Sequence, residues 1–283
     1  MGSLIHPVRI PFRLPINAET TVDRVVFAYV VAGERLCLVD TGPAGGEQAI
    51  VTALAGMGLS EKDVDLVVNT HEHPDHIGGN TFFQHTAQPR FACHAEAVRW
   101  IETLNVQFKE RPIFRFYSLA GQPVKIHHRL QDGEVIDLGD GIELKVIFIP
   151  GHSPGSIALF CPRDGSLIIG DAIQPVDHLP LYTDLALTRA SLNRLMGLSD
   201  VERMYLAWVE EPYTGKLINE ALQASLDYLD EVDGVVKKVA GDLPEASTPE
   251  TITREVMIQL GLDPPPVMAM TIASVKAHIS QSA

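Results

Sequence analysis

Metal-binding residue types are concentrated in one short segment of the chain, residues 71–76, which read HEHPDH. The whole chain has 11 histidines in 283 residues, so three within six residues stand far above an even distribution. Neutral imidazoles bind zinc, iron and related metals, and carboxylates complete such ligand sets. The segment follows the apolar run 66–68, which places it in a loop at a strand end, where a rigid support holds functional groups. We therefore predict a metal site here.

The order of side chains within the segment supports this interpretation. His71 and His73 are two residues apart, so in an extended loop they project to the same side. Glu72 lies between them and projects away, and we do not expect it to act as a base. The proline that follows favours a tight turn, which brings Asp75 and His76 back from the other side.

Two further candidate ligands follow apolar runs later in the chain. His152 lies in residues 150–155 (PGHSPG), where prolines and glycines hold it on a tight turn. Asp171 ends the run 167–171 (LIIGD). Each is a weak signal alone, because an aspartate at a strand end is commonly just a turn residue.

Together, these motifs resemble the metallo-β-lactamase superfamily. The similarity rests on HxHxDH at residues 71–76, PGHSPG at 150–155 and Gly-Asp at 170–171, in that order and spacing. The earlier Asp40-Thr41-Gly42 also resembles the family's strand that ends in Asp-Thr-Gly. The resemblance covers about residues 24–210, and its first motif is highly specific.

The resemblance implies an α+β fold, namely a four-layer αββα sandwich with the site at one edge of the two sheets. It also implies six metal ligands. His71, His73 and His152 would hold a first ion, Asp75 and His76 would hold a second ion, and Asp171 would bridge the two ions. Asp40 is either a supporting residue behind them or a plain turn residue. The expected cofactor is Zn²⁺, as one or two ions, with iron or manganese as alternatives.

The sequence departs from the family after its last expected strand. Family members with two metals usually carry another histidine there, whereas residues 207–212 read AWVEEP. Glu210 or Glu211 offers a carboxylate as a replacement, but a solvated acidic turn is the favoured interpretation. We therefore expect a weakened second metal site, with His178 as either a pocket residue or an ordinary loop residue.

Strands and helices are indicated by apolar periodicity. β-branched runs separated by turns predict strands at 24–32, 35–40, 65–70, 90–94, 134–138, 142–149, 156–161, 166–170 and 203–208. Apolar residues at helical spacing predict helices at 46–58 and 188–198. Strands mostly joined as hairpins, with helices outside, suggest two packed sheets covered by helices.

The pattern changes near Tyr213. Long amphipathic stretches predict helices at 216–240, at about 248–260 and at about 268–280. We therefore divide the chain into a metallo-β-lactamase-like αββα domain, residues 1–212, and a C-terminal helical region, residues 213–283. The apolar stripes of these helices are expected to pack on the sandwich or to join two copies in a homo-oligomer.

Composition narrows the partners. The net charge of −14 disfavours binding to nucleic acid and to anionic membrane surfaces. No apolar run is long enough for a transmembrane helix, and the first 15 residues lack the apolar core of a secretory signal. Cys37, Cys93 and Cys161 are expected as buried free thiols. Together these features predict a cytoplasmic protein.

The expected activity is hydrolysis of a small ester, thioester or lactone by a metal-activated hydroxide. Asp75 is expected to orient that hydroxide or to carry protons if the second metal does not fully occupy it. The segment after HxHxDH is similar to that of glyoxalase II-like thioesterases, although it does not name a substrate. Pocket walls are expected from residues 108–117 and 175–183.

Two alternatives stay open. Persulfide dioxygenases of the same superfamily use a single iron, for which His71, His152 and Asp171 are the matching trio. A non-catalytic binding protein on the same scaffold is the other alternative, and it predicts no stoichiometric metal.

Overall fold

Strands buried on both faces give the molecule its layers. The computed structural model describes residues 3–173, 178–262 and 267–279. Along β2 (Thr21–Ala32), Val26, Ala28 and Val30 pack into one apolar cluster, whereas Phe27 and Tyr29 pack into another. Because successive side chains of a strand point to opposite faces, this strand must lie between two layers.

The first sheet has the order β1-β2-β3-β4-β5-β6. The first three strands are antiparallel neighbours, and the later pairs are parallel. Its strands are β1 (Ile5–Pro15), β2, β3 (Leu36–Val39), β4 (Val64–Val68), β5 (Arg90–His94) and β6 (His128–Leu130). The expectation of mostly hairpin connections is therefore wrong for this half, because parallel strands require crossover segments.

The second sheet has the order β12-β11-β10-β9-β8-β7 and is antiparallel except where β10 meets β11. Its strands are β7 (Val135–Asp137), β8 (Glu143–Phe148), β9 (Ile157–Cys161), β10 (Ser166–Ile168), β11 (Arg203–Tyr205) and β12 (Tyr213–Thr214). An apolar cluster between the two sheets joins Tyr29 and Val68 of the first to Val146 and Leu159 of the second.

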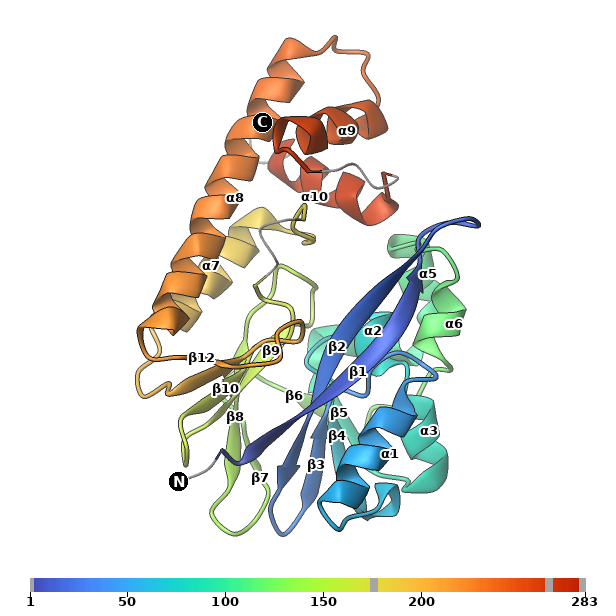
Figure 1. The fold of residues 1–283 in the computed structure, drawn as a ribbon, viewed down its shortest axis with the longest axis vertical. Coiled ribbons are helices and arrows are strands. Elements are labelled where there is room, and N and C mark those ends of the chain that lie inside the picture. Colours follow the sequence, from blue (N-terminus) through green and yellow to red (C-terminus); the bar gives the residue numbers. More distant parts are fainter. Residues whose placement is uncertain (1–2, 174–177, 263–266, 280–283) are drawn as a thin grey trace.

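Helices cover the outer face of each sheet, which completes four layers (Figure 1). On the first sheet these are α1 (Glu47–Gly56), α2 (Pro74–Ile77), α3 (Asn80–Thr86), α4 (Val98–Glu102), α5 (Leu104–Glu110) and α6 (Phe116–Ala120). On the second sheet they are α7 (Leu185–Met196) and α8 (Lys216–Asp242). The predicted αββα sandwich is confirmed.

The C-terminal helices extend this outer layer beyond the sheet. α8 packs its amphipathic face first on α7 and then on α9 (Pro249–Gln259) and α10 (Ala269–Ile279). The helical region begins at Lys216, while Tyr213–Thr214 pairs with β11 in the sheet. The end of the last predicted helix, residue 280, lies outside the described residues. Across the described part of the chain, no helix is both long and apolar enough to cross a membrane.

All nine predicted strands are present, most of them shorter than predicted, although β2 and β4 begin earlier and β5 has the predicted bounds. The strands β1, β6 and β12 and the helices α2 to α6 were missed. β1 contains Pro7, Pro11 and Pro15, which argue against a strand. The strand forms nonetheless because it lies at the sheet edge, where a missing N–H is tolerated. Cys37, Cys93 and Cys161 are buried free thiols, as expected.

Candidate metal centre

Loops that follow five strands meet at one edge of the sandwich. The chain reaches Asp40 after β3, His71 after β4, His152 after β8, Asp171 after β10 and Trp208 after β11. These strands run in the same sense within their sheets, so their carboxyl ends lie at a common edge. Sheet topology therefore gathers side chains that are up to about 170 residues apart in sequence.

Three histidines form the tightest cluster at this edge. One ring nitrogen each of His71, His73 and His152 lies within 4.8 Å of the other two. Nδ1 of His73 lies 2.9 Å from Nε2 of His152. Nε2 of His71 is buried and has no hydrogen-bond partner among the described residues. Buried nitrogens rarely go unpaired in proteins, so this convergence fits a metal ion held between them.

Asp40 sets the ring orientation of two of the histidines. Its carboxylate accepts hydrogen bonds from Thr70 N at 2.8 Å, from Thr70 Oγ1 at 2.7 Å and from His76 Nδ1 at 2.9 Å. Since the Thr70 hydroxyl proton goes to Asp40, its oxygen accepts from His71 Nδ1, which is 3.0 Å away. Both His71 and His76 are thereby left with Nε2 available to a metal.

His152 is oriented from the opposite side. Its Nδ1 donates to the carbonyl oxygen of Leu181 at 2.7 Å, so Nε2 carries the lone pair. Gly151 has φ +132, and a Cβ there would lie 2.5 Å from the backbone nitrogen of Thr188. Only glycine allows the turn to approach α7 this closely.

Glu72 anchors the His152 turn rather than facing the ligands. Its carboxylate accepts from Ser153 Oγ at 2.9 Å and from Gly155 N at 3.3 Å. Burial raises the pKa of Glu72 to about 7, although these hydrogen bonds oppose the shift. The prediction that Glu72 points away from the site agrees with this geometry, but its role in joining the two loops was not foreseen.

A second group adjoins the three histidines. Oδ1 of Asp171 lies 3.2 Å from Nε2 of His76, and Oδ2 lies 3.6 Å from Nε2 of His152. Asp171 is therefore positioned between the first and second groups, where the resemblance implied a bridging residue. Asp75 lines the same cavity and is half-buried.

Electrostatics favour neutral imidazoles in the first group and a charged pair in the second. Burial lowers the pKa values of His71, His73 and His152, the last to about 4. At His76, burial also acts to lower the pKa, but the carboxylates of Asp171 and Asp40 outweigh it and raise the value. Metal binding at His76 therefore has to displace a proton.

Arg111 lies in the wall expected from residues 108–117, but the sequence did not predict that its charge would meet the carboxylates of the site. It lines the cavity, and its charge interacts with the carboxylates of Asp75, Asp171 and Glu72. Burial raises the pKa of Asp75, with Asp171 adding to the effect and His76 and Arg111 opposing it. Nothing in the sequence around Arg111 marks it, because it follows α5 and meets the carboxylates only through the fold.

The structure does not bring either candidate replacement for the late histidine to the site. Glu210 and Glu211 are both exposed, and neither lines the cavity. Trp208 lies there instead, and its ring is 6.3 Å from that of His76 in an edge-on arrangement. The favoured interpretation of a solvated acidic turn agrees with this placement.

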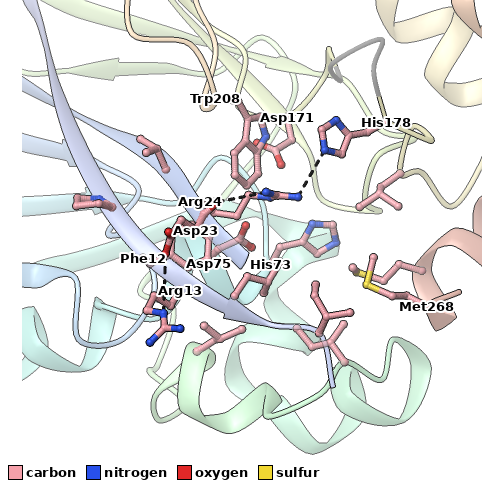
Figure 2. Close-up of a pocket in the computed structure, with 18 of the residues that line it drawn as sticks. Phe12, Arg13, Asp23, Arg24, His73, Asp75, Asp171, His178, Trp208 and Met268 are labelled. Carbon is pink, nitrogen blue, oxygen red and sulfur yellow. Dashed lines mark hydrogen bonds and ion pairs between the residues drawn. The ribbon is translucent and has the colours of Figure 1, made fainter. Parts of the chain in front are cut away.

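A cavity of about 600 Å³ opens over these residues. Figure 2 shows His73, Asp75 and Asp171 facing it, with Trp208, His178 and Arg24 around them. Both walls expected from the sequence contribute to the cavity. The wall at residues 108–117 provides Arg111 and Ile113, and the wall at residues 175–183 provides His178, Leu179 and Leu181. Residues 175–177 of the second wall lie outside the described residues.

One whole wall of the cavity was missed. Strands β1 and β2 contribute Phe12, Leu14, Arg24 and other residues, and Met268 and Met270 come from the C-terminal region. This wall was not predicted because the sequence did not indicate that β1 is a strand. Figure 1 shows the β1–β2 hairpin reaching past the first sheet toward α10.

Two other histidines, His94 and His278, contact residues outside the candidate metal centre. His94 stacks on Phe148 with ring centroids 3.9 Å apart. His278 is buried on α10, where Nδ1 lies 3.0 Å from Asp233 and Nε2 hydrogen-bonds to Tyr182.

Comparison with known proteins places this geometry in a family. The model of the metallo-beta-lactamase superfamily matches residues 21–206. A metallo-beta-lactamase family protein from Thermus thermophilus has a similar structure, with a TM-score of 0.78 and 21% sequence identity. The match covers 98% of this chain and 92% of that one, so the likeness in fold includes the C-terminal helices.

Curated relatives share sequence over part of their length. Acyl-coenzyme A thioesterase MBLAC2 of Gallus gallus is 37% identical over 145 residues, which are 48% of this chain and 52% of that protein. The hydroxyacylglutathione hydrolase of Maricaulis maris is 30% identical over 172 residues, 58% of each chain. The chain thus matches about half the length of these relatives.

Proposed function

Because the chain belongs to the metallo-beta-lactamase superfamily, we propose that it is a metal-dependent hydrolase of thioesters. The observation that carries the proposal is the convergence of His71, His73 and His152 on one point at the base of a cavity of about 600 Å³. The names of two relatives, a thioesterase and a hydroxyacylglutathione hydrolase, support thioesters over other esters and lactones.

The donor set fits a metal ion of the zinc type. Three imidazoles with low pKa values are neutral at pH 7, which is the form that binds metal. We assign these histidines to the first ion and Asp75, His76 and Asp171 to a second. When bound, the metal lowers the pKa of a water ligand and polarises a carbonyl. Iron and manganese can also bind imidazole and carboxylate ligands.

The chain's own groups then carry out three tasks. Where Asp75 does not hold the second ion, it faces the cavity with a raised pKa, which suits a carboxylate that accepts and returns a proton during hydrolysis. Trp208 and the apolar residues of the β1–β2 wall limit access of water. Arg111 balances the negative charge of Asp75 and Asp171 at the same place.

The oxygenase alternative uses only His71, His152 and Asp171. Here Nδ1 of His73 lies 2.9 Å from Nε2 of His152, so the site offers a third imidazole in addition to that trio. The names of the two relatives, a thioesterase and a hydroxyacylglutathione hydrolase, favour hydrolysis.

Elemental analysis of the purified protein tests the proposal, followed by removal of metal with a chelator and its return as Zn²⁺, Mn²⁺ or Fe²⁺. Thioester, ester, lactone and phosphodiester substrates are then compared, together with a persulfide under oxygen. We expect stoichiometric metal and metal-dependent thioester cleavage. Metal-free protein, or oxygen consumption with a persulfide and no thioester cleavage, would overturn the proposal.

A further inference from the structure

Positive charge is concentrated on the cavity wall of an otherwise acidic protein. The net charge of the chain is −14, yet Arg9, Arg13 and Arg24 of the β1–β2 hairpin all line the cavity, with Arg111 as a fourth cation. The carboxylates of Asp23, Asp75 and Asp171 line the same cavity. An arginine that none of them neutralises can still attract a negatively charged ligand into the cleft.

Arg24 differs from Arg13 and Arg111 in its partners, and it differs from Arg9 in being half-buried, because Arg9 is exposed. The charge of Arg111 interacts with the carboxylates of Asp75 and Asp171, and Arg13 lies 3.9 Å from the carboxylate of Asp23. Arg24 instead donates to the backbone oxygen of Asp23 at 3.2 Å and approaches Nε2 of His178 at 3.5 Å. Among the described residues, no carboxylate forms an ion pair with Arg24.

The guanidinium of Arg24 is held in a defined place. It is half-buried and projects from β2 into the cavity toward His178, as Figure 2 shows. Since a guanidinium can only donate, Nε2 of His178 is the acceptor of that contact. These two contacts orient the side chain, and neither of them is to a carboxylate.

The rest of the wall is suited to an apolar group. Phe12, Ile113, Leu179 and Met270 line the same cavity, and a volume of about 600 Å³ is that of a site for a whole small molecule. One cavity thus combines the candidate metal centre, an apolar surface and a cation without a carboxylate partner.

We propose that Arg24 binds an anionic oxygen group, a carboxylate or a phosphate, on one arm of the substrate, while the apolar wall receives the other arm. The proposal rests on the thioesterase function proposed above and narrows its substrate to anionic thioesters. A guanidinium pairs with either anion through two parallel N–H···O bonds, so a planar fork at this position selects charge and shape together.

Three thioesters test the idea, with the same acyl chain and thiol length but with a carboxylate, a phosphate or a neutral amide at the end of the thiol arm. Wild type, Arg24→Met, Arg24→Lys and Arg90→Met are compared. Arg90 is exposed at the amino end of β5 and does not line the cavity, so Arg90→Met is the matched control.

We expect wild type to prefer at least one anionic thioester over the amide by roughly tenfold to a hundredfold in kcat/KM, the range for charge-assisted hydrogen bonds. Arg24→Met should remove most of this preference, Arg24→Lys should restore part of it, and Arg90→Met should keep it. Whether carboxylate or phosphate is preferred identifies the natural group. Equal kcat/KM for all three end groups in wild type would overturn the proposal, and so would a preference that survives in Arg24→Met.

Binding of non-hydrolysable thioethers with the same three end groups, measured by calorimetry, gives a readout without turnover. The anionic thioethers should bind wild type more tightly than the amide, and Arg24→Met should bind all three alike. If wild type cleaves no thioester but still binds the anionic thioethers through Arg24, the proposed function fails while the anion site stands. If thioesters are cleaved but the thioethers bind alike, only the anion site fails.

Discussion

Oδ2 of Asp40 lies 2.9 Å from Nδ1 of His76, and both side chains are buried. The same oxygen accepts from Thr70 Oγ1, which in turn orients His71. Through these contacts a single carboxylate behind the ligands controls the ring orientation of one histidine in each proposed metal site.

Asp40→Asn should therefore weaken metal binding at both sites. An amide has only one oxygen, so it cannot accept from Thr70 N and also from the Thr70 hydroxyl and His76 Nδ1, and the negative charge behind both rings is lost. Removal of such supporting partners typically lowers metal affinity by about 10- to 100-fold. Competition with a chelator measures the change. Asp137→Asn, at an exposed position, is the control, and equal affinity in the two variants would show that Asp40 is only a turn residue.

His71→Ala should abolish binding at the first site together with activity. Its buried Nε2 is one of three imidazole nitrogens at the cluster, and loss of one of three protein ligands removes most of the affinity. Metal content per chain is the measurement. His128→Ala, which changes an exposed histidine, should keep the metal; wild-type content in His71→Ala would refute the ligand assignment.

The second ion should bind more weakly than the first, because no late histidine joins Asp75, His76 and Asp171. Glu210→Ala and Glu211→Ala should leave the number of bound ions unchanged, since both side chains are exposed away from the cavity. A stepwise titration with zinc measures both affinities. Two equally tight sites, or loss of an ion on changing either glutamate, would contradict this prediction.

Ser274→Ala should affect the metal centre from the C-terminal region. Ser274 Oγ accepts from the backbone nitrogen of Tyr182 at 3.1 Å, and the neighbouring Leu181 carbonyl orients His152. The variant leaves a buried N–H unpaired, which costs about 1–3 kcal/mol. We expect reduced stability and several-fold weaker metal binding. Ser199→Ala, at an exposed position, is the control for chemical denaturation and metal titration.

Removal of residues 213–283 should give insoluble protein. The truncation takes away β12, which pairs with β11, and exposes Leu192 and Leu195 of α7, which share an apolar cluster with α8. Large exposed apolar patches promote aggregation. Solubility and size-exclusion chromatography test this, and a soluble, metal-loaded monomer would contradict it. Association of two copies through the same helices remains a prediction, which the elution volume of the full chain tests.

Local patterns in the sequence were sufficient for the fold class and for much of the site. HxHxDH at residues 71–76 and the turn around His152 indicate metal binding, because histidines at this density and on such tight turns rarely have another role. The αββα layers follow from short apolar runs between turns and from the family resemblance. Long strands and amphipathic helices are local properties, so their periodicity is visible in the sequence.

Tertiary structure alone decided which side chains share the cavity. Arg24, Arg111 and Glu72 carry no local signal, since an arginine on a strand or after a helix is ordinarily a solvated residue. They acquire their roles only when the β1–β2 hairpin, the segment after α5 and the His152 turn meet over the carboxyl ends of the strands. The exclusion of Glu210 and Glu211 was decided in the same way, because Trp208 fills the adjoining space. Burial and proximity between distant segments arise from the packing of the sheets, and no window of sequence contains them.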